Sequence, residues 1–465
     1  MPAGSPLENR FLTAPTGRLF IANAVPMVFV MAMSGLLNVV DAVFLGHFVG
    51  ADAVAAVSVV FPPIMVTIAL SALVGGGMSS LFARHLGAGA LCEAGAVFAQ
   101  AHGLAIAAAL GLIGLFLLGG DALVRQLAGS DGTVAGMAHA YLLIMICATP
   151  VQFLLGLHAD AWRNEGRASL VALMSVGVTL ANAAFNYGLI VKAGLGVAGS
   201  AWGTVLAQLL ALALLVGLRL HGQGRVPLSA LWRHRWVAGW TGIATLGAPL
   251  SLGFIGIALV SATVIATLPH VAGEAHLQLA AAYGIVTRIL SFAFMPLMAI
   301  ALAMQGIVGN NVGAGLYRRS DTVLKLAVLT AFGWCGLVEF ACLAGAQLVG
   351  YGFVSDAVIA AQVAAILRPM AALYLFTGPV LVLALYFQAI GRPGQAAVLT
   401  LVKPFILCPV LVVGLAAVSG AEALWLAFPI AEGLVAVMAA AILFAALKVR
   451  AETGGLGLGP AGTMA

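Results

Sequence analysis

Charged residues are scarce in this chain. Aspartate, glutamate, lysine and arginine make up only 8% of its 465 residues. Hydrophobic residues make up 63%, and the mean hydropathy is +1.13. A soluble globular domain carries about 25% charged residues, so the composition excludes that class. We expect an all-α, multi-pass membrane protein instead.

Cysteine is equally sparse, with five scattered residues and no CxxC pair. This pattern implies no disulfide framework, no metal site and no cofactor. The chain also lacks a nucleotide-binding GxxxxGK[ST] loop and any recognisable Ser/His/Asp spacing. An ATP-driven pump is therefore excluded, and an intramembrane enzyme is disfavoured because no nucleophile–base pair is present.

The apolar runs predict about twelve membrane-spanning helices, since a helix of about 20 residues crosses the hydrocarbon core. The expected spans are 18–45, 53–82, 94–118, 134–158, 168–191, 196–218, 239–268, 278–307, 322–349, 359–389, 395–417 and 421–447.

The net charge of +5 reflects orientation in the membrane rather than nucleic-acid binding. Alternate connections carry nearly all the arginines, and the opposite set has only Arg125 and Lys192. Because basic loops stay in the cytoplasm, we expect both termini to be cytoplasmic.

Two halves are indicated by repeated segments. HLGAG at 85–89 and NVGAG at 311–315 each follow the second span of a half, and Gly166-Arg167 is echoed by Gly391-Arg392. We therefore expect two pseudo-symmetric six-helix lobes, 1–218 and 239–465, joined by a basic cytoplasmic linker at 219–238. An even number of spans gives both halves the same orientation, with a substrate site expected between them.

The first span contains a carboxylate, Asp41, whose burial in a bilayer costs roughly 2.5–3.5 kcal/mol. Such a residue is usually functional and faces a cavity or a partner. A helical face shared with Asp41 carries Met27, Met31, Ser34 and Asn38, spaced three or four residues apart. Pro26 removes a backbone donor just before this face, so we expect a hinge there.

Polar stripes also occur in the fifth and sixth spans. The fifth carries Ser175, Thr179, Asn182 and Asn186, and the sixth carries Ser200, Thr204 and Gln208. These stripes could simply join helices by hydrogen bonds. With an acid among them, we favour a solvated cavity that takes up a proton or a cation. In the second half, Glu339, Glu432, Arg288, Arg368 and Lys403 either form structural pairs or line the central cleft.

Several motifs resemble the multidrug and toxic compound extrusion (MATE) transporters over essentially the whole chain. They are VDAVFLGHFVGADAVAAVS, GGGMSSLFARHLGAG, LANAAFNYGLIVKAGLGVAGSAWGT, AAAYGIVTRILSFAFMPLMAIALAMQGIVGNNVGAG and YFQAIGRPGQA. The last two favour the branch similar to DNA-damage-inducible protein F.

The resemblance implies a V-shaped pair of lobes that exports organic, often cationic, compounds by antiport with protons or sodium. It also implies an ion-coupling cluster in the first lobe. By motif, Asp41, Asn182 and Thr204 match that cluster. Asn186 falls where this branch often has a second aspartate, so only Asp41 in the cluster can titrate. A sodium site of the kind found in the second lobe of Nor-type members is not expected, because the glutamate of those members falls near Ile257 and the segment 377–389 contains no acid.

The predicted function is thus a monomeric secondary exporter of small organic compounds in a prokaryotic cytoplasmic membrane, in contact with membrane lipid. Protonation of Asp41 from outside releases the cargo, and deprotonation inside resets the cycle. Sodium held by oxygens of Asp41, Asn182 and Thr204 is a variant. We expect Met27, Met31, Ser34, Asn38 and Thr179 to line the cargo path.

Two other functions are considered, one a different kind of transport and one without transport. A flippase for a lipid-linked saccharide precursor would need a large cationic cleft, and the few intramembrane cations disfavour it. A membrane scaffold or receptor would show no ion dependence, and its polar stripes would only hold helices together.

Overall fold

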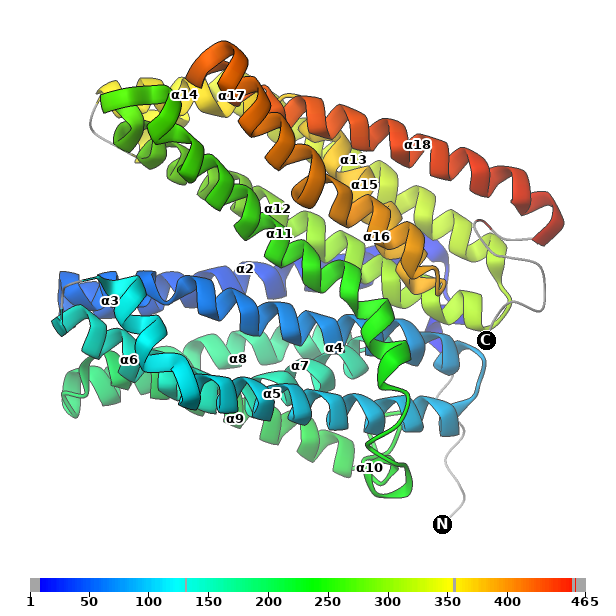
Figure 1. Cartoon of the computed structure of the whole chain (residues 1–465). Coiled ribbons are helices and arrows are strands. Elements are labelled where there is room, and N and C mark those ends of the chain that lie inside the picture. Colours follow the sequence, from blue (N-terminus) through cyan, green and yellow to red (C-terminus); the bar gives the residue numbers. More distant parts are fainter. Residues whose placement is uncertain (1–8, 130–131, 354–356, 454–455, 457–465) are drawn as a thin grey trace. The chain divides into compact units, whose positions relative to one another are not determined.

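The computed structural model describes residues 9–129, 132–353, 357–453 and 456. These residues are almost entirely helical and form no strand (Figure 1). They belong to two compact units. Unit 1 runs to Ala14 and then from Val25 to Ser251, whereas unit 2 comprises Pro15–Ala24 and the chain from Leu252 onward.

The helices of the first half include one π-helix, η1. They are α1 (Arg10–Thr13), α2 (Thr16–Phe48), α3 (Ala51–Val59), α4 (Phe61–Gly87), α5 (Leu91–Ala128), α6 (Gly132–Cys147), α7 (Thr149–Asn164), α8 (Ala168–Asn186), η1 (Tyr187–Lys192), α9 (Gly196–Leu220) and α10 (Ala230–Arg233).

The second half contains two short 3-10 helices, η2 and η3, and another π-helix, η4. Its elements are α11 (Trp240–Ala272), η2 (Gly273–Ala275), α12 (His276–Gly313), α13 (Tyr317–Phe353), α14 (Ala357–Ala371), η3 (Tyr374–Phe376), α15 (Thr377–Ala389), α16 (Pro393–Val402), η4 (Lys403–Leu407), α17 (Cys408–Leu424) and α18 (Ala427–Thr453).

Within the described residues, nine segments are long and apolar enough to cross a membrane, or eleven if each of two bent helix pairs counts as one span. The longest segment, Trp240–Gly313, contains both α11 and α12, of 33 and 38 residues. Each of these exceeds the length that a span needs. When α11 and α12 are counted as two spans instead of one, the eleven spans become the expected twelve.

The two halves share local structure at the repeated motifs. Gly89 after α4 and Gly315 after α12 both have a φ of 72°. In each case the next residue donates a backbone hydrogen bond across the helix end, Ala90 to His85 and Leu316 to Asn311. Glycine suits this left-handed position because it has no Cβ. The 226-residue sequence echo therefore marks equivalent helix ends.

The segment predicted as a linker, 219–238, is held on unit 1 by a buried ion pair. Arg219 Nη1 donates to Glu165 Oε1 at 2.8 Å and to the Val226 carbonyl at 2.6 Å. The Glu165 carboxylate also accepts from the backbone N–H of Arg225 at 3.1 Å. Unit 1 extends beyond 219–238 as far as Ser251, because the first residues of α11 pack against α4. A Cβ at Gly247 would overlap the Leu73 carbonyl. The lobe boundary inferred from the sequence stays a prediction.

Each unit has its own apolar core. In unit 1, one cluster joins the end of α2 to α3, α6 and α9 through residues such as Leu45, Val60, Leu142 and Ala201. In unit 2, α11, α12, α14 and α17 meet around Val286, Val363, Leu367 and Val412. These cores fix the helices from which the polar side chains project.

Candidate functional site

Asp41 lies near the end of α2, half-buried in unit 1, and accepts hydrogen bonds from two other helices. Asn186 Nδ2 on α8 donates to Asp41 Oδ1 at 2.6 Å. Thr204 Oγ1 on α9 donates to Asp41 Oδ2 at 3.3 Å. The carboxylate therefore ties together three helices that are separate in the sequence.

Asn182 completes the cluster. Its Nδ2 donates to Thr204 Oγ1 at 3.1 Å, and its Oδ1 accepts from Asn186 Nδ2 at 3.2 Å. Asn182 and Asn186 are fully buried, and Thr204 is 6% exposed. Asp41 accepts both of its hydrogen bonds in the cluster and donates none, an arrangement that suits an ionised carboxylate because that group only accepts.

Two buried oxygens beside this network have no hydrogen-bond partner among the described residues. They are Asn186 Oδ1 and Ser200 Oγ, the latter one turn before Thr204 on α9. An unpartnered buried acceptor is costly, so each of these oxygens has capacity for a further hydrogen bond or ligand beside the carboxylate. Carboxylate, amide and hydroxyl oxygens are the ligands that hard cations prefer.

Glycines let α8 and α9 approach closely enough to build the cluster. A Cβ at Gly203 would overlap Asn186 Oδ1, and one at Gly199 would come within 3.1 Å of the Leu189 backbone. Small residues at a helix interface allow this close packing in membranes. The α-helical hydrogen bonding also ends at Asn186, where η1 begins. Such π-helical turns are frequent at functional sites.

The structure therefore brings together all four residues predicted for ion coupling. Their role in coupling stays a prediction. Sequence reasoning missed Gly203, which gives no signal of its own, and did not assign Ser200 to the site. The four-residue spacing between Ser200 and Thr204 could have indicated it.

The residues predicted to line the cargo path differ in their surroundings. Met27 is fully buried, Met31 is half-buried and Ser34 is exposed. Thr179 is buried and donates to the Ser175 carbonyl at 3.0 Å. The side chain of Asn38 lies outside the described part of the structure. These assignments stay predictions.

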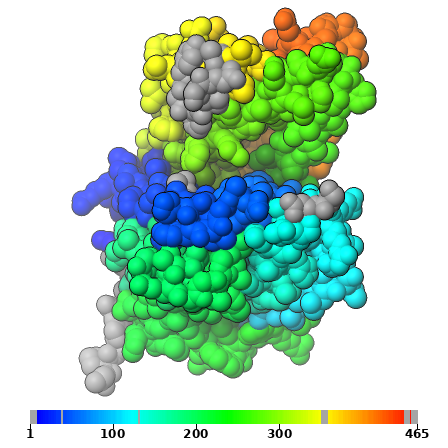
Figure 2. Space-filling model, turned by 90° about the vertical axis from the view of Figure 1, so that its left-hand side faces the viewer, coloured from blue at the N-terminus to red at the C-terminus, as the bar shows by residue number. Residues whose placement is uncertain are grey.

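Helix α2, which carries Asp41, is continuous from Thr16 to Phe48 and includes the predicted hinge Pro26. It contributes to the molecular surface, where its residues appear in blue (Figure 2). Apolar side chains at Phe29, Leu36 and Val43, seven residues apart, are exposed along it. An apolar stripe of this kind suits contact with lipid or with an apolar ligand.

In unit 2, both intramembrane acids have partners. Glu432 on α18 forms an ion pair with Lys403 and accepts from Thr377 Oγ1 at 2.9 Å. Glu339 on α13 accepts from the backbone N–H groups of Leu373 and Leu375 at 3.2 and 2.8 Å. These contacts join α13, α15, η4 and α18, and Glu339 satisfies donors exposed by the break between α14 and α15.

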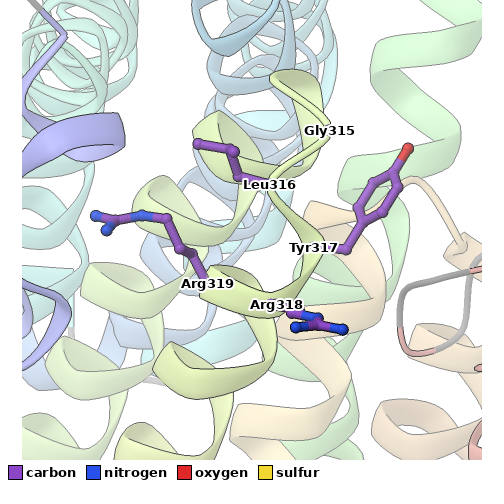
Figure 3. A pocket seen from close by; sticks show the side chains of 5 residues that line it. All are labelled: Gly315, Leu316, Tyr317, Arg318 and Arg319. Atoms are coloured by element: carbon purple, nitrogen blue, oxygen red, sulfur yellow. The ribbon is translucent and has the colours of Figure 1, made fainter.

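A pocket of about 330 Å³ lies at the turn between α12 and α13. Gly315, Leu316, Tyr317, Arg318 and Arg319 line it, and the side chains of Tyr317 and Arg319 point in opposite directions (Figure 3). Arg319 Nε donates to Asn311 Oδ1 at 3.1 Å, which fixes this turn. The pocket contains none of the predicted site residues.

Comparison with known proteins gives a consistent result. The MatE family model matches residues 26–188 and 249–413. The "FAD transporter" of Shewanella oneidensis is 24% identical, over 92% of this chain and 95% of its own length. The "Multidrug export protein MepA" of Staphylococcus saprophyticus is 23% identical, over 84% and 85% of the two chains. Human "Multidrug and toxin extrusion protein 1" is 27% identical, with 77% of this chain and 62% of that protein aligned.

Solved structures share the fold. A MOP superfamily transporter from Pyrococcus furiosus superposes with a TM-score of 0.86 at 21% identity, covering 97% of this chain and 99% of the other. A MATE structure in the straight conformation gives 0.85 at 20% identity with the same coverage. One in the bent conformation also gives 0.85, at 21% identity, covering 96% and 97%.

Proposed function

The chain belongs to the MatE family of multidrug and toxin extrusion transporters, which are not enzymes, and on this premise we propose that it exports small organic compounds in exchange for protons at Asp41. The observation that carries the proposal is the hydrogen-bond cluster around that carboxylate. Of its four residues, Asp41 alone can gain or lose a proton.

The cycle follows from how a carboxylate changes when it is protonated. Ionised Asp41 accepts from Asn186 and Thr204 and holds α2 against α8 and α9. A proton entering from outside turns one of its oxygens into a donor, which then needs an acceptor. Asn186 Oδ1 is available after rotation of the amide. The rearranged contacts loosen α2, which bends near Pro26 and releases the cargo, and deprotonation inside restores the cluster.

Sodium is the second candidate for the coupling ion. The oxygens of Asp41, Asn182 and Thr204 are of the type that hard cations bind, and Asn186 Oδ1 adds an unpartnered one. Sodium would neutralise the carboxylate as a proton does. It would keep the amide and hydroxyl oxygens directed inward rather than require a donor–acceptor exchange.

We place the protein as a monomer in a prokaryotic cytoplasmic membrane, with both termini in the cytoplasm and 219–238 linking two lobes. Its arginines follow that topology. Organic cations are the cargo that the resemblance suggests. A relative named FAD transporter supports a second cargo class, organic anions. A flippase for a lipid-linked saccharide remains the alternative function.

The deciding experiment measures efflux of a fluorescent organic cation from proteoliposomes, with a pH gradient and a sodium gradient imposed separately. Wild type is compared with Asp41→Asn, which keeps the shape of the side chain but cannot titrate. We expect one gradient to drive export and the variant to lose at least about 90% of it, because the carboxylate is the coupling group.

Asp52→Asn serves as the control, since Asp52 is exposed in the first turn of α3. It should export at the wild-type rate. Full gradient-driven export by the Asp41→Asn variant would refute the coupling role. Absence of gradient-dependent flux for a broad panel of organic cations and anions would instead favour the lipid-precursor flippase.

A further inference from the structure

Two arginines lie within membrane-spanning helices of unit 2 and make no hydrogen bond or ion pair with the described residues. Arg288 belongs to α12 and Arg368 to α14, and both side chains are exposed. An arginine within a membrane span usually pairs with another group or faces a water-filled cavity. Each of these two therefore faces water or a group from outside the described chain.

Both arginines lie deep along their helices. Arg288 follows the start of α12 by twelve residues, and Arg368 follows the start of α14 by eleven. At a rise of 1.5 Å per residue these distances are about 18 and 16 Å, roughly half the hydrocarbon thickness. The two helices contact each other near their N-terminal ends, where Gln362 Nε2 donates to Gln278 Oε1 at 3.4 Å. Counted from this contact, Arg288 lies ten residues further along α12 and Arg368 six residues further along α14, about 15 and 9 Å at 1.5 Å per residue.

The two acids within the spans of unit 2, Glu339 and Glu432, make other contacts in this arrangement. Glu432 is already neutralised by Lys403, and both oxygens of Glu339 accept backbone hydrogen bonds. Among these five charged side chains, three are positive and two negative. Lys403 and Glu432 compensate each other, and Glu339 is bound only by neutral backbone N–H groups, so the five side chains together leave one net positive charge.

The side chains beside Arg288 suit an organic ligand rather than a small ion alone. Phe292 lies one turn along the same face of α12 and is 54% exposed. An exposed ring four residues from an arginine offers a stacking surface next to a charged donor. Guanidinium groups bind carboxylate and phosphate through paired N–H donors, a geometry that lysine cannot provide.

We propose that the cargo of this transporter carries a carboxylate or phosphate group, and that Arg288 and Arg368 of unit 2 bind it. The inference rests on the proposed export function but concerns a different set of residues. Asp41 in unit 1 couples transport to the ion, and the arginines select the cargo. Acidic cargo thereby supplies the partner that each guanidinium lacks.

The test is an equilibrium binding measurement without any gradient. Purified full-length protein in nanodiscs of phosphatidylcholine is titrated with two matched pairs of fluorescent compounds. Riboflavin 5′-phosphate is compared with riboflavin, and rhodamine 110, which has a free carboxyl group, with its methyl ester rhodamine 123. We expect at least one acidic member to bind about tenfold more tightly than its partner.

Variants then assign the preference to residues. Arg288→Gln and Arg368→Gln should each reduce it several-fold, and the double variant should abolish it. Arg125→Gln is the matched control, because Arg125 is 73% exposed and paired only with Asp121 on α5. It should bind like wild type. Thermal unfolding of every variant shows whether a loss comes from misfolding, and both arginines are exposed, so we expect none.

Two outcomes would overturn the proposal. Either no acidic compound outbinds its partner in the wild type, or the preference survives in the double variant. Repeating the titration in nanodiscs with phosphatidylglycerol identifies the source of the acidic group. Loss of the preference there would show that the arginines hold a lipid headgroup. Failure of ion-coupled flux would contradict the exchange at Asp41 but leave this binding result unaffected.

Discussion

Asn186 makes the shortest contact to Asp41 and also holds an unpartnered buried oxygen. An aspartate at this position would give the cluster two titratable groups. The amide instead supplies a permanent donor to the carboxylate. In the proposed cycle, its unpartnered oxygen accepts a hydrogen bond from the protonated form, so that one carboxylate alternates between two hydrogen-bonded arrangements.

Replacing Asn186 with leucine tests this double role. The change removes the donor to Asp41 and the unpartnered oxygen together. We expect proton-driven export to fall about tenfold or more, since a hydrogen bond to a charged group contributes about 1.5–3 kcal/mol. The thermal midpoint should also fall, because the buried Asn182 Oδ1 loses its donor. Ser58→Ala, at an exposed hydroxyl bonded only within α3, is the control. Unchanged export would show that Asn186 is dispensable.

At the scale of the helices, the site depends on how closely α8 and α9 pack. Asn182 and Asn186 are on α8 and Thr204 is on α9, so the cluster forms only if the two backbones come together. Gly199 and Gly203 provide the space for this approach. In unit 2, the break between α14 and α15 also depends on a neighbouring helix, because Glu339 from α13 accepts hydrogen bonds from its backbone.

Gly203→Ala should disturb this packing. The added methyl group would overlap Asn186 Oδ1, and overpacking of this kind typically costs about 1–3 kcal/mol. We expect a lower thermal midpoint and export reduced by at least about tenfold. The control is Gly217→Ala on the same helix, where a Cβ meets nothing within 4 Å. Equal behaviour of the two variants in unfolding and flux assays would mean that the close approach is unimportant.

At the scale of the whole molecule, the distribution of the arginines predicts an orientation in the membrane. They are concentrated in alternate connections, and a chain with an even number of spans returns to the side on which it began. Arg318, exposed at the turn after α12, and Arg125, exposed at the end of α5, fall on opposite sides in this scheme.

Cysteine labelling in intact cells tests the orientation. In a variant whose five native cysteines are replaced by alanine, Arg125→Cys should react with a membrane-impermeant maleimide added outside. Arg318→Cys should react only after the cells are permeabilised. Both residues are exposed, so access depends on the side of the membrane rather than on burial. The reverse pattern would place both termini outside.

The sequence by itself determined the class of protein, the number of spans, the internal repeat and the residues of the Asp41 cluster. These follow from patterns that are local along the chain: length of apolar runs, helical spacing of polar residues and glycines at helix ends. The polar stripes stand out because polar groups are rare inside spans, and the resemblance to MATE transporters selected Asp41, Asn182, Asn186 and Thr204 among them.

Only the tertiary structure decided which of these polar groups touch, which are left without partners and which charges are compensated. The sequence offered Glu339, Glu432, Arg288, Arg368 and Lys403 as equivalent candidates for pairing. Helix packing gives these five residues different partners. Lys403 forms an ion pair with Glu432, and Glu339 accepts hydrogen bonds at the break between α14 and α15. Contacts between residues far apart in the chain depend on the close approach of helices, which no local pattern records.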